Sequence, residues 1–265
     1  KLKKINKAVD LLIIDNYKLG FDWEIKIKKY VKKILVIDDF SKKHHCNIYL
    51  NYNTYKVDKK YLPDSCLKLL GPKYIILNPL YLNKRKKTIL SKKKFNIFIF
   101  MGGADKNNFT LKFAEYFKKL KFNNFIFNFV LGINNKRNKD ILKISKKVKN
   151  YKIYYNLENL KSLLLKSDLG ITNGGQVIWE LIYNKIPNII FCKNKYRNNI
   201  ILKFRKIIKT HIFETKAKKP IKNDMKDLDH LLINYKYYFK KKSQNNKLID
   251  GKGLERISKK INIHI

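Results

Sequence analysis

The chain has 265 residues, of which 45% are hydrophobic, so it can bury one large core or two modest ones. No apolar run approaches the ~20 residues of a membrane-spanning helix. The cysteines, Cys46, Cys66 and Cys192, are odd in number and widely spaced, which excludes a disulfide framework or a zinc motif and leads us to expect a cytoplasmic protein. With 61 Lys+Arg against 20 Asp+Glu, the net charge is +41.

Apolar segments alternate with segments of helical period along the first third of the chain. We expect strands at residues 9–15, 33–38 and 46–53, with a helix at 21–31. Residues 74–77 are a candidate for one more short strand. Continuous apolar strands separated by helices are typical of parallel sheets that are covered on both faces.

A basic run without an apolar face, residues 83–94, predicts a linker between two domains. A second series of elements follows it, with strands expected at 95–103, 125–132, 151–155 and 168–172, and helices near 108–120, 136–149 and 157–165. The predicted fold class is α/β, with two Rossmann-like parallel-sheet domains facing a cleft. We place a partial first domain at 1–85, a second domain at 86–248, and a terminal helix at 249–265 that crosses back to the first.

Two strand ends of the second domain carry glycine pairs, Gly102-Gly103 in "IFIFMGGADKNN" and Gly174-Gly175 in "LGITNGGQVIWE". In open α/β sheets, ligands bind beyond the carboxyl ends of the strands, where helix N-termini present free amides. Glycine lets this backbone approach a phosphate closely. For one such turn, tight-turn packing is the better explanation. Two turns in one sheet, the second running straight into a helix, leave packing and anion binding as equal alternatives.

Glu180 lies about one and a half helical turns after Gly175. A carboxylate there can accept hydrogen bonds from both hydroxyls of a ribose, which suits a nucleotide ligand. The alternative is a solvated glutamate on the surface of a helix.

Several segments of the chain resemble a known enzyme family in the order in which that family carries them. "NGGQVIWE" has the spacing of the UDP-binding helix start in glycosyltransferases of the GT-B fold. More specifically, the chain resembles the UDP-2,4-diacetamido-2,4,6-trideoxy-β-L-altropyranose hydrolases of pseudaminic acid biosynthesis. The segments that carry the resemblance are "LLIIDNYKLG", "KILVIDDFSKKHHCNIYLNYN", "LLGPKYIIL", "IFIFMGGADKNNFTLK", "SDLGITNGGQVIWELIYNKIPNIIF" and "LIDGKGLERI".

The resemblance implies a GT-B-like enzyme that releases UDP from a UDP-linked sugar without a metal or cofactor. Its second domain would hold UDP and its first would hold the sugar and activate water. The implied catalytic residue is Tyr17, and the implied sugar-binding residues are Asp15 and Asn16. The implied UDP-binding residues are Gly102, Gly103, Asn173, Gly174, Gly175, Gln176 and Glu180.

The chain also departs from the family pattern. The family's Gly-x-Gly-His segment, whose histidine is thought to orient or deprotonate the attacking water, has no counterpart here. None of the five histidines replaces it on sequence grounds. Lys18 stands where a glycine is usual, and Asn78 where an arginine is common. An inactive UDP-sugar-binding fragment therefore stays an alternative.

Other candidate sites have simpler interpretations. We expect a structural turn rather than a metal site at His44-His45-Cys46, because adjacent ligands do not easily close one tetrahedral site. Neighbouring strand residues point to opposite faces, so we expect cap or turn roles for Asp38 and Asp39.

Two rival functions remain, a UDP-sugar-dependent glycosyltransferase and a basic nucleic-acid-binding protein. The lysines are spread along the whole chain, together with abundant Asn, Ile, Phe and Tyr, as AT-rich coding would produce. We therefore expect no specific nucleic acid partner. The expected partner is a UDP-sugar, and we expect a monomer with no integral membrane contact.

Overall fold

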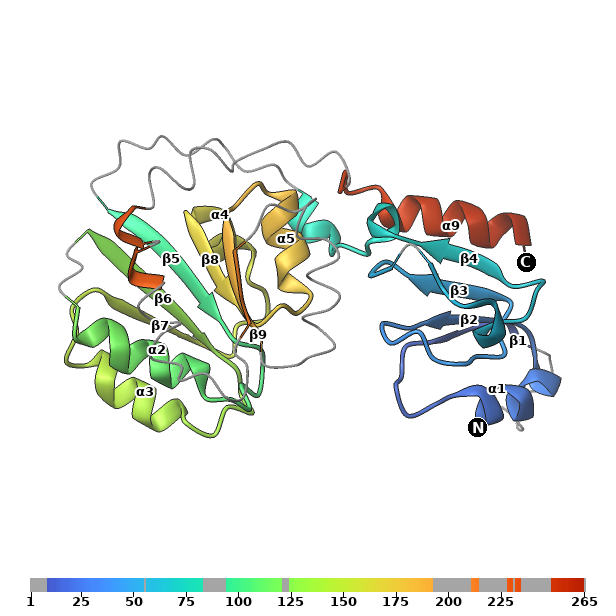
Figure 1. The fold of residues 1–265 in the computed structure, drawn as a ribbon, viewed down its shortest axis with the longest axis horizontal. Coiled ribbons are helices and arrows are strands. Elements are labelled where there is room, and N and C mark those ends of the chain that lie inside the picture. Colours follow the sequence, from blue (N-terminus) through green and yellow to red (C-terminus); the bar gives the residue numbers. More distant parts are fainter. Residues whose placement is uncertain are drawn as a thin grey trace. The chain divides into compact units, whose positions relative to one another are not determined.

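The computed structural model describes residues 9–54, 56–82, 94–120, 124–192, 211–214, 228–230, 232–234 and 249–264. The chain divides into two compact units, one made of Lys1–Leu77 with Lys247–Ile265 and the other of Asn78–Asn246 (Figure 1). The predicted linker at residues 83–94 lies outside the described residues except for Lys94. Within the described ranges, no helix is both long and apolar enough to span a membrane.

The first unit is built on four parallel strands in the order β1-β2-β3-β4. They are β1 (Val9–Ile14), β2 (Val31–Ile37), β3 (Ile48–Asn51) and β4 (Leu67–Leu70). Because parallel strands end at the same edge of a sheet, the segments after β1, β2 and β3 lie side by side (Figure 1).

Alternate residues of these strands point to opposite faces, and each face is covered by a helix. One face packs Ile34 and Val36 against α1 (Phe21–Ile27). The other packs Leu35 and Ile48 against Ile257 of α9 (Gly253–His264), which belongs to this unit although it ends the chain. Short 3-10 turns, η2 (Lys28–Tyr30) and η3 (Lys59–Tyr61), complete the connections.

The expected strand at residues 74–77 is wrong. The chain there forms a 3-10 turn, η4 (Pro72–Tyr74), followed by irregular backbone, and the fourth strand is β4 instead. The apolar residues are buried for another reason: Tyr74 packs in the same cluster as Ile257 of α9, and a side chain at Gly253 would lie 2.0 Å from the Ile75 carbonyl oxygen. Burial beneath a helix, not pairing in a sheet, explains the apolar run.

Cys46 and Cys66, which precede β3 and β4, are brought together by the pairing of these strands. Their sulfur atoms lie 3.7 Å apart, and both residues are buried free thiols. The sequence spacing alone gave no indication of this contact.

The second unit contains six parallel strands in the order β10-β9-β8-β5-β6-β7. The strands are β5 (Phe95–Phe100), β6 (Phe125–Leu131), β7 (Tyr151–Tyr155), β8 (Leu169–Thr172), β9 (Asn188–Cys192) and β10 (His211–Glu214). Counted from β5, this is the 3-2-1-4-5-6 order of doubly wound dinucleotide-binding sheets. The order reverses between β5 and β8, where such sheets open a crevice for ligands.

Helices cover both faces of this sheet, as continuous apolar strands require. Phe113 and Phe117 of α2 (Phe109–Lys118) pack on one face together with α3 (Asn138–Ser145). Leu164 of α4 (Lys161–Lys166) and Leu181 of α5 (Val177–Tyr183) pack on the other. The turn η5 (Pro79–Leu82) adds the buried Tyr81 to the second face.

Candidate functional site

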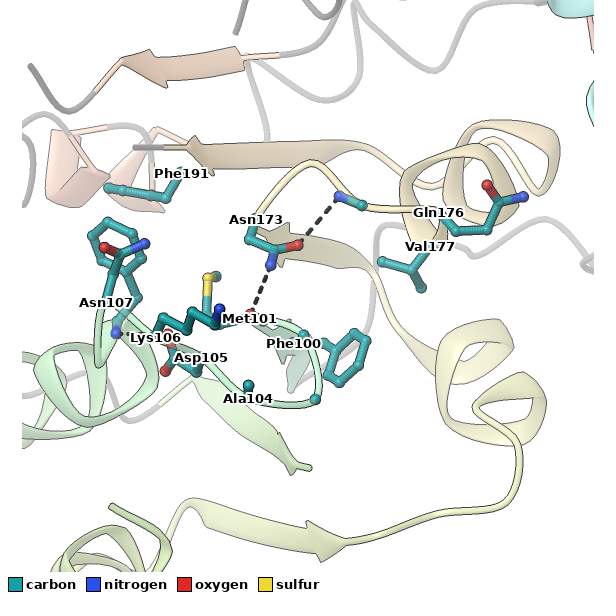
Figure 2. A pocket seen from close by; sticks show the side chains of 14 residues that line it. Phe100, Met101, Ala104, Asp105, Lys106, Asn107, Asn173, Gln176, Val177 and Phe191 are labelled. Carbon is teal, nitrogen blue, oxygen red and sulfur yellow. Dashed lines mark hydrogen bonds between the residues drawn. The ribbon is translucent and has the colours of Figure 1, made fainter. Parts of the chain in front are cut away.

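A cavity of about 550 Å³ lies at the carboxyl ends of β5 and β8, where the strand order of the second unit reverses (Figure 2). The segments after the two strands, each carrying a glycine pair, form most of its wall. The lining residues are Phe100, Met101, Gly102, Gly103, Ala104, Asp105, Lys106, Asn107, Phe109, Asn173, Gly175, Gln176, Val177 and Phe191.

Asn173 joins the two glycine turns (Figure 2). Its Nδ2 donates to the Met101 carbonyl oxygen at 2.7 Å, and its Oδ1 accepts from the Gly175 amide at 3.2 Å. Gly102 has φ +85°, and a Cβ there would lie 2.8 Å from Asn173 Nδ2. Both a left-handed backbone and close packing therefore require glycine at this position.

A third glycine, Gly132 at the end of β6, completes the packing. A Cβ on Gly132 would lie 2.2 Å from the carbonyl oxygen of Gly103. The sequence gives Gly132 no evident role, because a contact between two strand ends is not visible in local sequence. Its signal was its position as the last residue of a predicted strand.

The start of α2 differs from the expected free helix terminus. The buried Asp105 carboxylate accepts from the amides of Phe109 at 3.0 Å and Thr110 at 2.8 Å. Burial raises the pKa of Asp105, although these hydrogen bonds oppose the shift. Two amides at this helix start are thus capped by the chain's own carboxylate.

Lys106, next to Asp105, is an exposed cation on the cavity wall that sequence analysis did not select. Backbone amides and lysine side chains are among the groups that bind phosphate in proteins, and this cavity has both kinds in its wall.

Glu180 is buried in α5, with 8% of its surface exposed, so the alternative of a solvated helix glutamate is wrong. It is not among the residues that line the cavity. Burial raises the pKa of Glu180 to about 7. Its charge also helps to raise the pKa of the nearby Tyr81, whose shift is caused mainly by burial. A carboxylate buried in this way is stabilised in its ionised form when a ligand donates hydrogen bonds to it.

In the first unit, the sequence-selected residues Asp15, Asn16 and Tyr17 follow β1 and are all exposed. Asn16 Oδ1 accepts from the Lys18 amide at 2.9 Å, which closes a local turn. The Tyr17 hydroxyl donates to Asp39 Oδ2 at 2.6 Å, across the gap between the ends of β1 and β2. Asp39 therefore connects the ends of two strands, a role that the sequence did not indicate.

Asp38 faces the interior, and here the expected turn role is correct, because its carboxylate accepts from the Phe40 and Lys42 amides. It also lies 3.5 Å from His44 Nε2, while His44 Nδ1 lies 2.7 Å from Glu24 Oε1. Burial alone lowers the pKa of His44, but the contacts with Asp38 and Glu24 outweigh burial and raise it to about 9.

With its pKa raised to about 9, His44 is protonated at neutral pH between two buried carboxylates. The sequence gives no signal for Glu24, because it lies in α1 among residues of ordinary helical pattern. Among the described residues, no group of three His, Cys, Asp or Glu side chains is arranged to hold a metal ion.

Comparison with known proteins places this geometry in a family. No family model matches the chain. The chain is 31% identical over 193 residues to the UDP-2,4-diacetamido-2,4,6-trideoxy-β-L-altropyranose hydrolase of Campylobacter jejuni, covering 70% of this chain and 68% of that protein. The chain belongs to this hydrolase family. It is also 32% identical to an uncharacterized protein of Methanocaldococcus jannaschii, MJ1062, across 80% of this chain and about half, 46%, of that protein.

Solved structures show that this member of the hydrolase family has a GT-B-like fold. MurG of Acinetobacter baumannii superposes with a TM-score of 0.65 at 13% identity, covering 96% of this chain and 75% of MurG. A putative UDP-N-acetylglucosamine 2-epimerase of Listeria monocytogenes gives 0.63 at 13% identity, covering 98% and 75% of the two chains. The predicted fold class is confirmed, with two parallel-sheet α/β domains.

Proposed function

We propose that this protein hydrolyses a UDP-linked 2,4-diacetamido-2,4,6-trideoxy sugar to the free sugar and UDP, a reaction of pseudaminic acid biosynthesis. The identity to the Campylobacter jejuni hydrolase supports the substrate class. The observation that carries the proposal is the convergence of the glycine turns after β5 and β8 on one cavity at the reversal point of the sheet.

We assign the diphosphate of UDP to this cavity. The Lys106 ammonium and the amides of the first glycine turn would bind its negative charge, and the missing side chains at Gly102 and Gly103 let the phosphates approach the backbone. In the second turn, the Gly174 and Gly175 amides already donate to Thr172 Oγ1 and Asn173 Oδ1. In the reaction, water attacks the sugar C1 and the bond from C1 to the β-phosphate oxygen breaks. The electron pair leaves with UDP, and fixed amide dipoles stabilise the charge that develops there.

We assign the ribose to Glu180. Its position in the first turn of α5, after Gly174-Gly175, is that of the ribose-binding acid in the family pattern. A buried carboxylate with a pKa of about 7 accepts ribose hydroxyl hydrogens best when it is ionised. Nucleotide binding would therefore release a proton near neutral pH.

We assign the sugar to the exposed end of β1, where Asp15, Asn16 and Tyr17 lie. A base must accept a proton from the attacking water. His44 is unsuited to this role, because it is buried between Glu24 and Asp38 and is held in its protonated form. The family pattern assigns the base to a histidine of the Gly-x-Gly-His segment.

The direct test is to incubate the protein with the UDP-2,4-diacetamido sugar in H₂¹⁸O, without any acceptor, and to analyse both products by mass spectrometry. Free sugar carrying one ¹⁸O, with unlabelled UDP, supports hydrolysis at C1. Label in UDP would show attack at phosphorus instead. Turnover only after an acceptor is added would favour a glycosyltransferase.

A further inference from the structure

Tyr17, Asp39 and Asn53 form a connected array at the carboxyl edge of the first sheet. Each residue follows a different strand: Tyr17 follows β1, Asp39 follows β2 and Asn53 follows β3. The Tyr17 hydroxyl donates to Asp39 Oδ2, and Asn53 Nδ2 donates to Asp39 Oδ1, both at 2.6 Å. Both oxygens of one carboxylate are therefore used to connect an exposed phenol with a buried amide.

The array is anchored in the core. The backbone amide of Asn53 donates to Asn51 Oδ1 at 3.0 Å, and Asn51 Nδ2 donates to the Tyr49 hydroxyl at 3.1 Å. Tyr49 in turn donates to Asp38 Oδ2 at 2.9 Å. Because Asn53, Asn51, Tyr49 and Asp38 are all buried, Asp39 is held in place from the interior, whereas 53% of Tyr17 is exposed.

The neighbouring acids divide their roles by burial. Asp38 is 3% exposed and contacts the buried Tyr49 and His44, whereas Asp39 is partly exposed and contacts Tyr17. Burial raises the pKa of Asp39 and repulsion from Asp38 and Asp15 adds to this, against the hydrogen bonds from Tyr17 and Asn53. The Tyr17 ring is fixed further by edge-on packing against Phe40, with centroids 4.7 Å apart.

We propose that Asp39 is the positioning residue for Tyr17 and makes the phenol oxygen a hydrogen-bond acceptor for the substrate's sugar. This rests on the proposed function. A phenol carries a single hydrogen, and here that hydrogen goes to Asp39. Any ligand group that bonds to the same oxygen must therefore be a donor. The sugar partner of Tyr17 is accordingly a hydroxyl or an acetamido N–H, not a carbonyl oxygen.

Asp39→Asn tests this polarity with little change of shape. Asn53 Nδ2 is a donor, so the new carboxamide turns its oxygen toward Asn53 and its NH₂ toward Tyr17. Tyr17 then accepts from residue 39 and presents its own hydrogen to the ligand. Asp10→Asn is the matched control, because Asp10 is an exposed carboxylate in β1 that pairs with Lys32 at 2.7 Å.

The experiment measures the affinities of UDP and of UDP-2,4-diacetamido-2,4,6-trideoxy-β-L-altropyranose for the full-length protein by calorimetry. We expect Tyr17→Phe and Asp39→Asn each to weaken UDP-sugar binding about 3- to 10-fold, with no further loss in the double variant. The affinity for UDP alone, and both affinities of Asp10→Asn, should stay unchanged. If the variants still bind UDP but bind the UDP-sugar as the wild type does, or if the losses add in the double variant, the inference is overturned while the proposed function stands.

A second readout needs no ligand. The Asp39 carboxyl is titrated by ¹³C NMR and assigned by its loss in Asp39→Asn. Removing the Tyr17 hydrogen bond in Tyr17→Phe should raise the pKa of Asp39 further, and an unchanged titration would overturn the inference. If neither UDP nor the UDP-sugar binds to folded protein, the proposed function falls and the inference falls with it.

Discussion

Asn173 holds the two glycine turns of the second unit together, and Gly102 is the residue that makes room for it. The Asn173 side chain donates to the carbonyl of Met101, directly before Gly102, and accepts from the amide of Gly175. A methyl group at Gly102 would meet Asn173 Nδ2 at 2.8 Å. The cavity between β5 and β8 is therefore built on close packing of glycines as well as on their backbone freedom.

The packing of Gly132 against Gly103 predicts a large effect of Gly132→Ala. The new methyl group would lie 2.2 Å from a backbone oxygen, so the two turns must separate. We expect the free energy of unfolding, measured by urea denaturation, to fall by about 1–3 kcal/mol, and UDP affinity to fall as well. Gly20→Ala is the control, because nothing lies within 4 Å of its added Cβ. Equal stability of the two variants would contradict this packing.

Glu180 predicts a pH dependence of nucleotide binding. Its pKa of about 7 means that raising the pH through neutrality ionises the carboxylate, which then accepts the ribose hydroxyls, so UDP affinity should rise across this range. Glu180→Gln should remove the pH dependence and weaken binding at pH 8 by about 1.5–3 kcal/mol. Calorimetry in buffers of different ionisation enthalpy would measure the proton released. Glu158→Gln, at an exposed position of the same unit, should behave as the wild type.

Lys106 predicts a salt-dependent contribution to UDP binding. Lys106→Ala should weaken UDP binding several-fold at low ionic strength and less at high salt, because its interaction with the diphosphate is exposed to screening. Uridine, which has no phosphate, should show no such difference. The control is Lys139→Ala, at an exposed position of α3. Equal salt slopes for the two variants would remove Lys106 from the phosphate site.

His44 predicts that the first unit loses stability at alkaline pH. Its pKa is raised from 6.5 to about 9, so its contribution is fully present below about pH 6.5 and is lost as the pH rises through about 9. His44→Gln should lower the free energy of unfolding by about 3–5 kcal/mol at pH 7, because Glu24 then stays buried without its cation. Urea denaturation between pH 6 and pH 10 tests both effects. His45→Gln, at a less buried position, should change stability little, and a flat pH profile in the wild type would argue against the charged pair.

The sequence predicted the elements that depend on local pattern. Apolar runs located β1, β2, β5, β6, β7 and β8, because strands buried on both faces are continuous apolar segments. The same rule produced the wrong strand at residues 74–77, where the apolar residues lie beneath α9. An apolar run records burial, and the partner that causes the burial is set by the tertiary fold.

The candidate site was predictable to the same extent. Glycine pairs at strand ends pointed to the cavity, but its closure by Gly132 depends on a contact between two strand ends. Likewise, the sequence does not show which of the neighbouring acids Asp38 and Asp39 faces inward. Asp38 and Asp39 take different roles because His44 and Tyr49 meet the first, whereas Tyr17 and Asn53 meet the second.

The central claim, that UDP binds at the glycine turns after β5 and β8, can be tested with ¹⁵N-glycine labelling. The chain has only ten glycines, so each amide can be followed while UDP is added in about 0.3 M salt to suppress charge-driven association. We predict saturable shifts at Gly102, Gly103, Gly174 and Gly175, with Gly20, Gly71 and Gly251 unchanged. Absent or non-saturating shifts at the four turn glycines of the folded protein would contradict the account.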